Sequence, residues 1–154
     1  MSGRIEARLK ELGITLPDAP APAANYVPYV ISGNLVHVSG QISTGPDGLI
    51  KGTAGDDISV EAATAAARVC GLNLIAQVNA ACNGDLDRVK RVVRLGGFVA
   101  STPTFFQQPT IINGASDLMA EVFGDIGAHA RAAVGVAALP LGVAVEIDGL
   151  FEIS

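Results

Sequence analysis

Arg131 and Glu146 are charged side chains set among apolar neighbours. Arg131 opens the apolar segment 130–139, and Glu146 lies within the apolar run 143–147. A guanidinium can bind a planar carboxylate through two parallel hydrogen bonds, and a partly buried glutamate can exchange protons with water near neutral pH. The two residues therefore fit a site that binds a small carboxylate and activates water. A structural ion pair, or two solvent-facing side chains, would fit the same pattern.

Tyr29 and the run Ser39-Gly40-Gln41 add polar groups near the first predicted hairpin. The motifs of phosphate-binding, metal-binding and serine hydrolase sites are absent. No glycine-rich phosphate loop is present. The only histidines, His37 and His129, lack metal-ligand spacing to cysteines or carboxylates, and we interpret both as structural or surface residues. His37 and Ser39 share a strand face, but no nucleophile elbow surrounds the serine. We expect no metal, no cofactor and no serine hydrolase site.

The elements that must position these residues follow from composition and turn signals. Residues 1–24 predict a short helix and a proline-rich arm that pack on a domain formed by residues 25–154. The domain's predicted elements are strands at 26–31 and 35–40, a helix at 59–82, a strand at 89–100, a helix at 109–123, and a strand pair at 132–138 and 143–153. This order predicts an α+β domain with one mixed sheet and two helices on one face.

The composition favours a protein that associates with copies of itself. Hydrophobic residues make up 49% of the chain and charged residues only 16%, against about 25% in typical soluble domains. No apolar run of about 18 residues could span a membrane, so a subunit interface explains the missing charge. The net charge of −5 argues against nucleic acid.

Two further features predict a cytoplasmic protein. The charged N-terminus does not resemble a signal peptide. Cys70 and Cys82 lie about 18 Å apart in one predicted helix, too far for a disulfide, and fit a reducing compartment.

Four motifs together resemble the RidA/YjgF (reactive intermediate deaminase) family, also labelled endoribonuclease L-PSP-like. Residues 130–140 read Ala-Arg-Ala-Ala-Val-Gly-Val-Ala-Ala-Leu-Pro, and residues 145–148 read Val-Glu-Ile-Asp. They are similar to the family's C-terminal signature, A-R-x-x-V-x-V-x-x-L-P followed by V-E-I-[ED]. Pro28-Tyr29 and the run 38–42, Val-Ser-Gly-Gln-Ile, resemble its N-terminal motifs. The N-terminus is longer than in typical members, so the chain resembles a divergent branch of this family.

The resemblance implies a chorismate-mutase-like fold that assembles as a homotrimer around a central barrel, with ligand sites between subunits. It implies cofactor-independent hydrolysis of small 2-imino or 2-enamine acids to 2-keto acids and ammonia. In this reaction Arg131 clamps the substrate carboxylate and Glu146 places or activates the attacking water. The resemblance further implies a set of substrate-binding residues: Tyr29, Ser39, Gly40, Asn113 and the backbone near Ala133.

Other interpretations stay open on the sequence alone. Phe105 and Phe106, in the loop 101–108, either shape the pocket or belong to an ordinary packed loop. A protein that binds small carboxylates without turning them over would keep Arg131 as its anchor. An endoribonuclease or translation-inhibitor role would use a basic cluster, but without nearby aromatic residues this cluster fits a solvated strand edge better; its members are Arg88, Lys90, Arg91 and Arg94.

Overall fold

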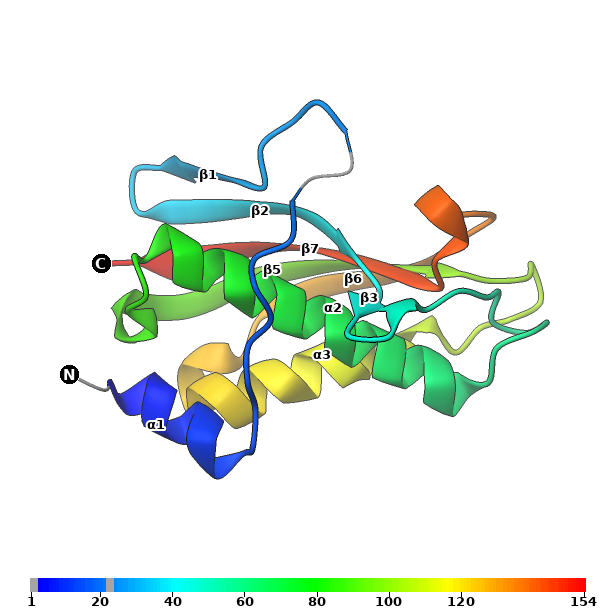
Figure 1. The fold of residues 1–154 in the computed structure, drawn as a ribbon. Coiled ribbons are helices and arrows are strands. Elements are labelled where there is room, and N and C mark those ends of the chain that lie inside the picture. The colour runs from blue at the N-terminus through cyan, green and yellow to red at the C-terminus, as the bar shows by residue number, and fades with distance from the viewer. Residues whose placement is uncertain (1–2, 22–23) are drawn as a thin grey trace.

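The computed structural model describes residues 3–21 and 24–154, which form a five-stranded sheet with helices against one face (Figure 1). The strands follow the order β1-β2-β7-β5-β6. All neighbours are antiparallel except β5 and β6, which run parallel because a helix connects them. Two short strands, β3 and β4, form a separate hairpin. The strand bounds are β1 (Tyr29–Ser32), β2 (Leu35–Ile42), β3 (Thr44–Gly45), β4 (Gly48–Leu49), β5 (Val89–Ala100), β6 (Ala130–Val136) and β7 (Val145–Ile153).

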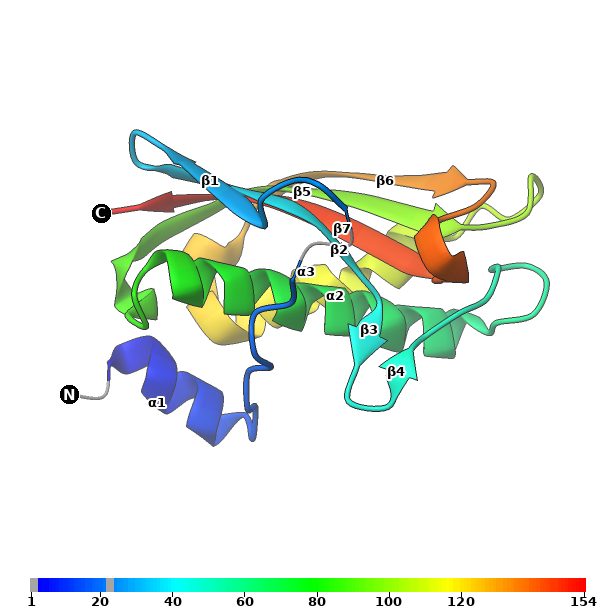
Figure 2. The ribbon, with the colours of Figure 1, turned by 45° about the horizontal axis from the view of Figure 1, so that its top comes forward.

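Two long helices, α2 (Val60–Ala81) and α3 (Gln108–Phe123), lie side by side under the sheet, as Figure 2 shows from a second direction. The Ser59 hydroxyl caps α2 by accepting a hydrogen bond from a first-turn N–H at 3.1 Å. Asn83 and Gly84 follow the helix with positive φ angles and stop it. The predicted α+β class, with both of these helices on one face, is confirmed.

The core lies between the sheet and these two helices. The helices approach closely, because a Cβ at Gly114 would collide with the Thr64 carbonyl. Apolar side chains from both layers fill the space, and fully buried examples are Val36, Leu74, Leu95, Ile112 and Phe151.

One predicted pairing is wrong. The segments 132–138 and 143–153 were expected to pair with each other, but β5 lies between β6 and β7. A strand–helix–strand connection returns its second strand parallel to the first and beside it. Because β5, α3 and β6 form such a connection, β6 pairs with β5, and β7 pairs with the other edge of β5. The intervening segment holds a short 3-10 turn, Pro140–Gly142.

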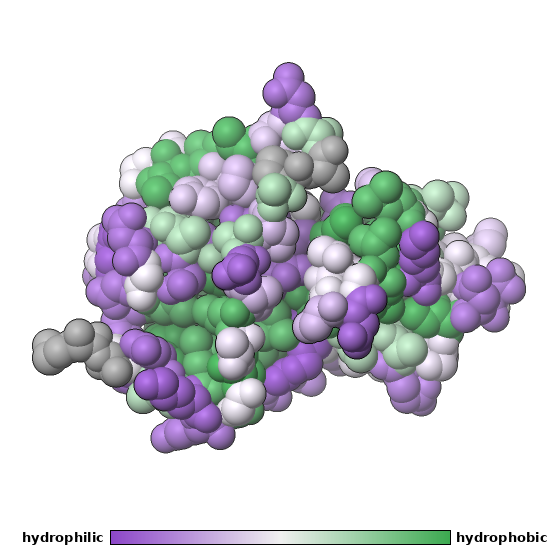
Figure 3. All heavy atoms as spheres, viewed as in Figure 1, coloured by the Kyte–Doolittle hydropathy of each residue, from purple (hydrophilic) through white to green (hydrophobic). Residues whose placement is uncertain are grey.

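The short helix α1 (Arg4–Glu11) is held by residues distant in the sequence. Ile5 and Leu9 enter the core, while hydrophilic side chains gather on the outer side of α1 (Figure 3). The Asp87 carboxylate accepts hydrogen bonds from the backbone N–H groups of Arg4 and Ile5, each at 2.9 Å. Asp87 thus takes the place of an N-terminal cap residue in α1.

The arm that follows α1 runs without regular structure up to residue 21, the last described residue of this segment. The Gln77 amide of α2 donates a hydrogen bond to the Pro20 carbonyl at 2.6 Å and so fixes the arm to the helix layer. Pro22, the third proline of the predicted arm, lies outside the described residues.

The second face of the sheet has no cover among the described residues. Side chains alternate between the two faces along a strand, so Glu146, Asp148 and Leu150 of β7 share the uncovered face. Val30 and Val134 also lie on it, with 51% and 44% of their surface exposed. This face of the sheet therefore exposes apolar side chains in the part of the chain that the structure describes.

Asp87→Ala should loosen α1 while leaving the sheet intact. Hydrogen bonds from Ile5 and Arg4 lower the pKa of Asp87, because they favour the ionised carboxylate. A lowered folded-state pKa means that the contact stabilises docking above the ordinary value of 3.8 and is lost as the pH falls through the folded-state value. We expect a loss of about 1 kcal/mol at neutral pH, measured by urea unfolding, with faster amide exchange in α1. Asp47→Ala, in an exposed turn, is the control, and equal effects of both changes would contradict the capping role.

Candidate functional site

Arg131 lies on the helix-facing side of the edge strand β6, where its guanidinium contacts α3. Its Nη1 donates a hydrogen bond to the Ser116 hydroxyl at 3.0 Å, and its Nη2 donates to the Pro109 carbonyl at 3.1 Å. Within residues 3–21 and 24–154, no carboxylate lies within 4.0 Å of the guanidinium. A guanidinium carries five N–H donors, so three remain for a ligand.

Asn113 and Ala133 lie near this guanidinium. Asn113 is four residues after Pro109 and three before Ser116, so the three residues share one face of α3; its side chain is exposed. Ala133 shares the strand face of Arg131, two residues away, and packs partly against the core. We call Arg131, Asn113 and Ala133 the arginine cluster.

Glu146 is half-buried on the uncovered face of the sheet, beside Gly40 of β2. A Cβ on Gly40 would collide with the Glu146 carboxylate, so glycine makes room for it. Burial raises the pKa of Glu146 above its ordinary value of 4.5, and the Asp148 carboxylate raises it further. Asp148 pairs with Arg94 at 3.6 Å, but no described cation lies within 4.0 Å of Glu146. We call Glu146 and Gly40 the glutamate cluster.

Ser39 precedes Gly40 of the glutamate cluster, and Tyr29 pairs with Val38, the residue before Ser39. Ser39 lies in the irregular part of β2. Its hydroxyl donates a hydrogen bond to the Val27 carbonyl at 2.7 Å, and its backbone N–H donates to the Pro28 carbonyl at 2.9 Å. Tyr29 begins β1 and packs partly against the core. Ser39 therefore fixes the segment that leads into Tyr29.

The strand register keeps the two clusters apart within one chain. Arg131 pairs with Leu95, which pairs with Gly149 across β7. Glu146 is an odd number of residues from Gly149 on the same strand, so its side chain points to the opposite face. Among residues 3–21 and 24–154, a single chain thus presents a cation without a carboxylate partner on one face of the sheet and a carboxylate without a cation partner on the other.

The loop 101–108 places its two aromatic residues differently. Phe105 packs partly against the core, whereas Phe106 is 79% exposed. Both border a hollow of about 460 Å³ between the start of α3 and the end of β6. Phe105 behaves as part of an ordinary packed loop, and a role for Phe106 in a ligand pocket stays a prediction.

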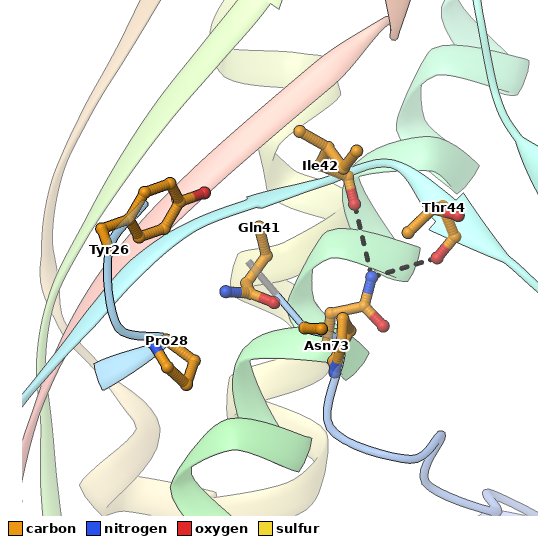
Figure 4. Close-up of a pocket in the computed structure, with 9 residues that line it drawn as sticks. Tyr26, Pro28, Gln41, Ile42, Thr44 and Asn73 are labelled. Carbon is orange, nitrogen blue, oxygen red and sulfur yellow. Dashed lines mark hydrogen bonds between the residues drawn. The ribbon is translucent and has the colours of Figure 1, made fainter. Parts of the chain in front are cut away.

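A hollow that the sequence did not indicate lies beside the end of β2 (Figure 4). Tyr26, Gln41 and Asn73 are among the residues that line it. The Asn73 amide donates hydrogen bonds to the carbonyls of Ile42 and Thr44 at 3.3 and 3.0 Å. These contacts tie α2 to the strand that carries the glycine of the glutamate cluster.

Two residues beside Arg131 were missed from the sequence. Ser116 was not considered, and His129 was interpreted as a structural or surface residue, yet the Ser116 hydroxyl lies 2.8 Å from His129 Nε2 and 3.0 Å from Arg131 Nη1. His129 is two residues before Arg131, so period-two spacing could have indicated it. Ser116 is fifteen residues from Arg131, and no local pattern connects them.

The basic cluster at the start of β5 lies at an edge of the sheet. Because β6 pairs with β5 only from Arg94 onward, residues 89–93 have a strand neighbour on one side only, in the part of the chain that the structure describes. The interpretation as a strand edge is confirmed for these residues. Arg88 already donates to the Ser154 carbonyl at 2.8 Å, and Arg94 pairs with Asp148.

Residues 3–21 and 24–154 contain no group of three or more histidine, cysteine or acidic side chains that could hold a metal ion. None of the described helices has the length and apolar character needed to cross a membrane. Cys70 and Cys82 are buried and form no disulfide.

Asp148→Asn should lower the pKa of Glu146, because it removes a like charge from the same face of the sheet. NMR titration of the side-chain carboxyl carbon measures the shift, with Glu152→Gln as a control farther along β7. A raised folded-state pKa also means that stability falls as the pH rises from the unfolded value through the folded one. The free energy of unfolding of the wild type should therefore fall relative to that of Glu146→Gln as the pH rises between these two pKa values. A Glu146 pKa that Asp148→Asn leaves unchanged would contradict the coupling.

The comparisons agree with this architecture. A family model described as "YjgF/chorismate mutase-like, putative endoribonuclease" matches residues 6–151. Protein TCP17 of Trypanosoma cruzi is 54% identical over 155 residues, which cover 99% of this chain and 96% of that protein. A Shewanella oneidensis structure described as a "putative endoribonuclease" has a TM-score of 0.93 at 35% identity, covering 98% of this chain and 100% of its own. RidA from an Antarctic Psychrobacter has a TM-score of 0.60 at 28% identity, covering 91% of this chain and 99% of its own. The chain belongs to the RidA/YjgF family and has its chorismate-mutase-like fold.

Proposed function

We propose that the protein hydrolyses small 2-imino or 2-enamine acids to 2-keto acids and ammonia, without a cofactor, at sites formed between copies of the chain. The observation that carries the proposal is the pair of uncompensated charges. Arg131 has neutral partners and three N–H groups to spare, and Glu146 has a raised pKa and no cation within 4.0 Å among the described residues. Family membership supports the same chemistry.

The proposed reaction needs only these two side chains and water. The Arg131 guanidinium binds the substrate carboxylate, which places the C=N carbon in a fixed position. An enamine first becomes the imine by taking a proton at its β-carbon and losing one from nitrogen. Glu146 then accepts a proton from water as the water oxygen bonds to the C=N carbon, and passes that proton to the imine nitrogen. Glu146 next transfers the carbinol hydroxyl proton to the same nitrogen, so that ammonia leaves as the carbinol oxygen forms the C=O bond. A carboxyl whose pKa lies above its ordinary value is suited to both transfers.

The uncovered face of the sheet supports assembly with other copies. Val30, Leu150 and Val134 give this face an apolar character that one chain does not cover in the part described. We infer a homotrimer in which the three sheets turn this face inward around a central barrel. The arginine cluster of one subunit and the glutamate cluster of its neighbour then complete each site.

A protein that binds carboxylates without turnover is the second candidate, because Arg131 alone could anchor a 2-keto acid. An RNA-directed role draws on the endoribonuclease description of the relatives. Two members of the basic cluster, Arg88 and Arg94, are already engaged within the chain, which favours the carboxylate ligand.

Loss of either charge should abolish ammonia release from 2-aminoacrylate generated in situ by a serine dehydratase. Arg131→Ala should also lose pyruvate binding, and Arg131→Lys should recover little, because lysine cannot bind a carboxylate in two-pronged fashion. Glu146→Gln should lose at least about a hundredfold in kcat while still binding pyruvate. Arg88→Ala is the matched control. Equal loss of binding and turnover in Glu146→Gln would favour the non-catalytic binder.

Mixing two inactive variants should restore activity if each site draws on two subunits. In the proposed trimer, every assembly that contains both Arg131→Ala and Glu146→Gln chains has about one third of its intersubunit sites with both residues intact. Co-expression with two different tags and tandem purification yields the mixed assemblies, and ammonia release measures recovery. Arg131→Ala mixed with Arg131→Met is the control and should stay inactive. No recovery in verified mixed assemblies would contradict shared sites.

A further inference from the structure

A chain of hydrogen bonds runs behind Arg131 from the start of β6 to α3. His129 Nδ1 lies 2.6 Å from the Gly127 carbonyl oxygen, and His129 Nε2 lies 2.8 Å from the Ser116 hydroxyl. The same hydroxyl accepts a hydrogen bond from Arg131 Nη1 at 3.0 Å. The side chains that form these hydrogen bonds are partly buried, which limits competition from water.

The hydrogen positions in this chain follow from the donor and acceptor types. A carbonyl oxygen can only accept, so His129 Nδ1 carries the hydrogen, and in the neutral imidazole Nε2 carries a lone pair. The Ser116 O–H donates to that lone pair, which leaves the hydroxyl oxygen to accept from Arg131. The Gly127 carbonyl thus selects the tautomer that orients the hydroxyl toward the guanidinium.

Both groups that hold Arg131 are neutral, in contrast to the partners of other arginines in the chain. Arg131 contacts a hydroxyl and a backbone carbonyl. Three other arginines each lie close to a carboxylate: Arg8 to Glu11 at 3.0 Å, Arg68 to Glu121 at 3.1 Å and Arg94 to Asp148 at 3.6 Å. A carboxylate partner would fix the guanidinium but cancel its charge. Neutral partners fix it and leave the full charge for an anionic ligand.

We propose that Ser116 and His129 are positioning residues that hold Arg131 ready for a ligand carboxylate. The inference rests on the proposed function in that Arg131 is the anchor of the site, but it does not depend on the reaction that follows. A free arginine side chain samples many rotamers. Fixing it before the ligand arrives removes that entropic cost from binding.

The test compares variants that remove a hydrogen bond between Arg131, Ser116 and His129 with variants that keep it. Ser116→Ala and His129→Leu remove the hydrogen bonds. Ser116→Thr keeps the hydroxyl, and His129→Gln offers a side-chain oxygen that can accept from it. We expect pyruvate affinity, measured by calorimetry, to fall about tenfold or more in the first pair and to stay within about threefold of wild type in the second. In the deaminase assay the loss should appear in KM rather than kcat, because Glu146 and its water are untouched.

NMR of the His129 ring nitrogens gives a readout that does not require catalysis. We expect the Nδ1–H tautomer in wild type and a mixture of tautomers or a shifted Nε2 signal in Ser116→Ala. An Nε2–H tautomer in wild type, or unchanged pyruvate affinity in both loss variants, would overturn the positioning role even if ammonia is released. Weakened pyruvate binding in those variants, with no ammonia release by wild type, would support positioning and refute the deaminase reaction instead.

Discussion

The close packing of α2 on α3 governs the rest of the structure. Gly114 leaves no room for a side chain against the Thr64 carbonyl, and Gly71 lies against Leu118, so the two helices share one face of the sheet. No helix in the described part of the chain then covers the other face, although Val134 on that face is apolar and exposed. A sheet covered on one side needs a second layer, and another copy of the same chain can supply it. The arrangement of the helices therefore leaves a sheet face that another copy of the chain could cover.

The alternation of side chains along strands explains how charged side chains are accommodated in such an apolar sheet. Glu146 remains half-buried without a cation because it faces the uncovered side, where Gly40 leaves space for its carboxylate. Arg131 remains without a carboxylate because a hydroxyl and a carbonyl from α3 satisfy part of its hydrogen bonding. Each charge is tolerated for a different local reason, and neither reason involves the other charge.

Much of the fold could be predicted from the sequence, because its signals are local. Ser59 and the Asn83-Gly84 pair mark the ends of α2, and the valine-rich run 89–100 forms β5 with the predicted bounds. Strand order could not be predicted in full, since it depends on how the β5–α3–β6 connection returns to the sheet. The site was predicted in part: Arg131 and Glu146 stand out by type, but their separation onto opposite faces requires the register. Ser116 meets His129 only through the packing of α3 on the sheet.

The cap that Asp87 supplies to α1 has a consequence for the order of folding. A helix of eight residues is too short to persist alone in water, and here its N-terminal hydrogen bonds come from a side chain more than eighty positions later. Arg8 likewise donates to the Glu121 carbonyl at 2.8 Å. Helix α1 therefore cannot dock until the segments that carry Asp87 and Glu121 have been synthesised and have folded. It precedes these segments in the sequence but reaches its final position only after them.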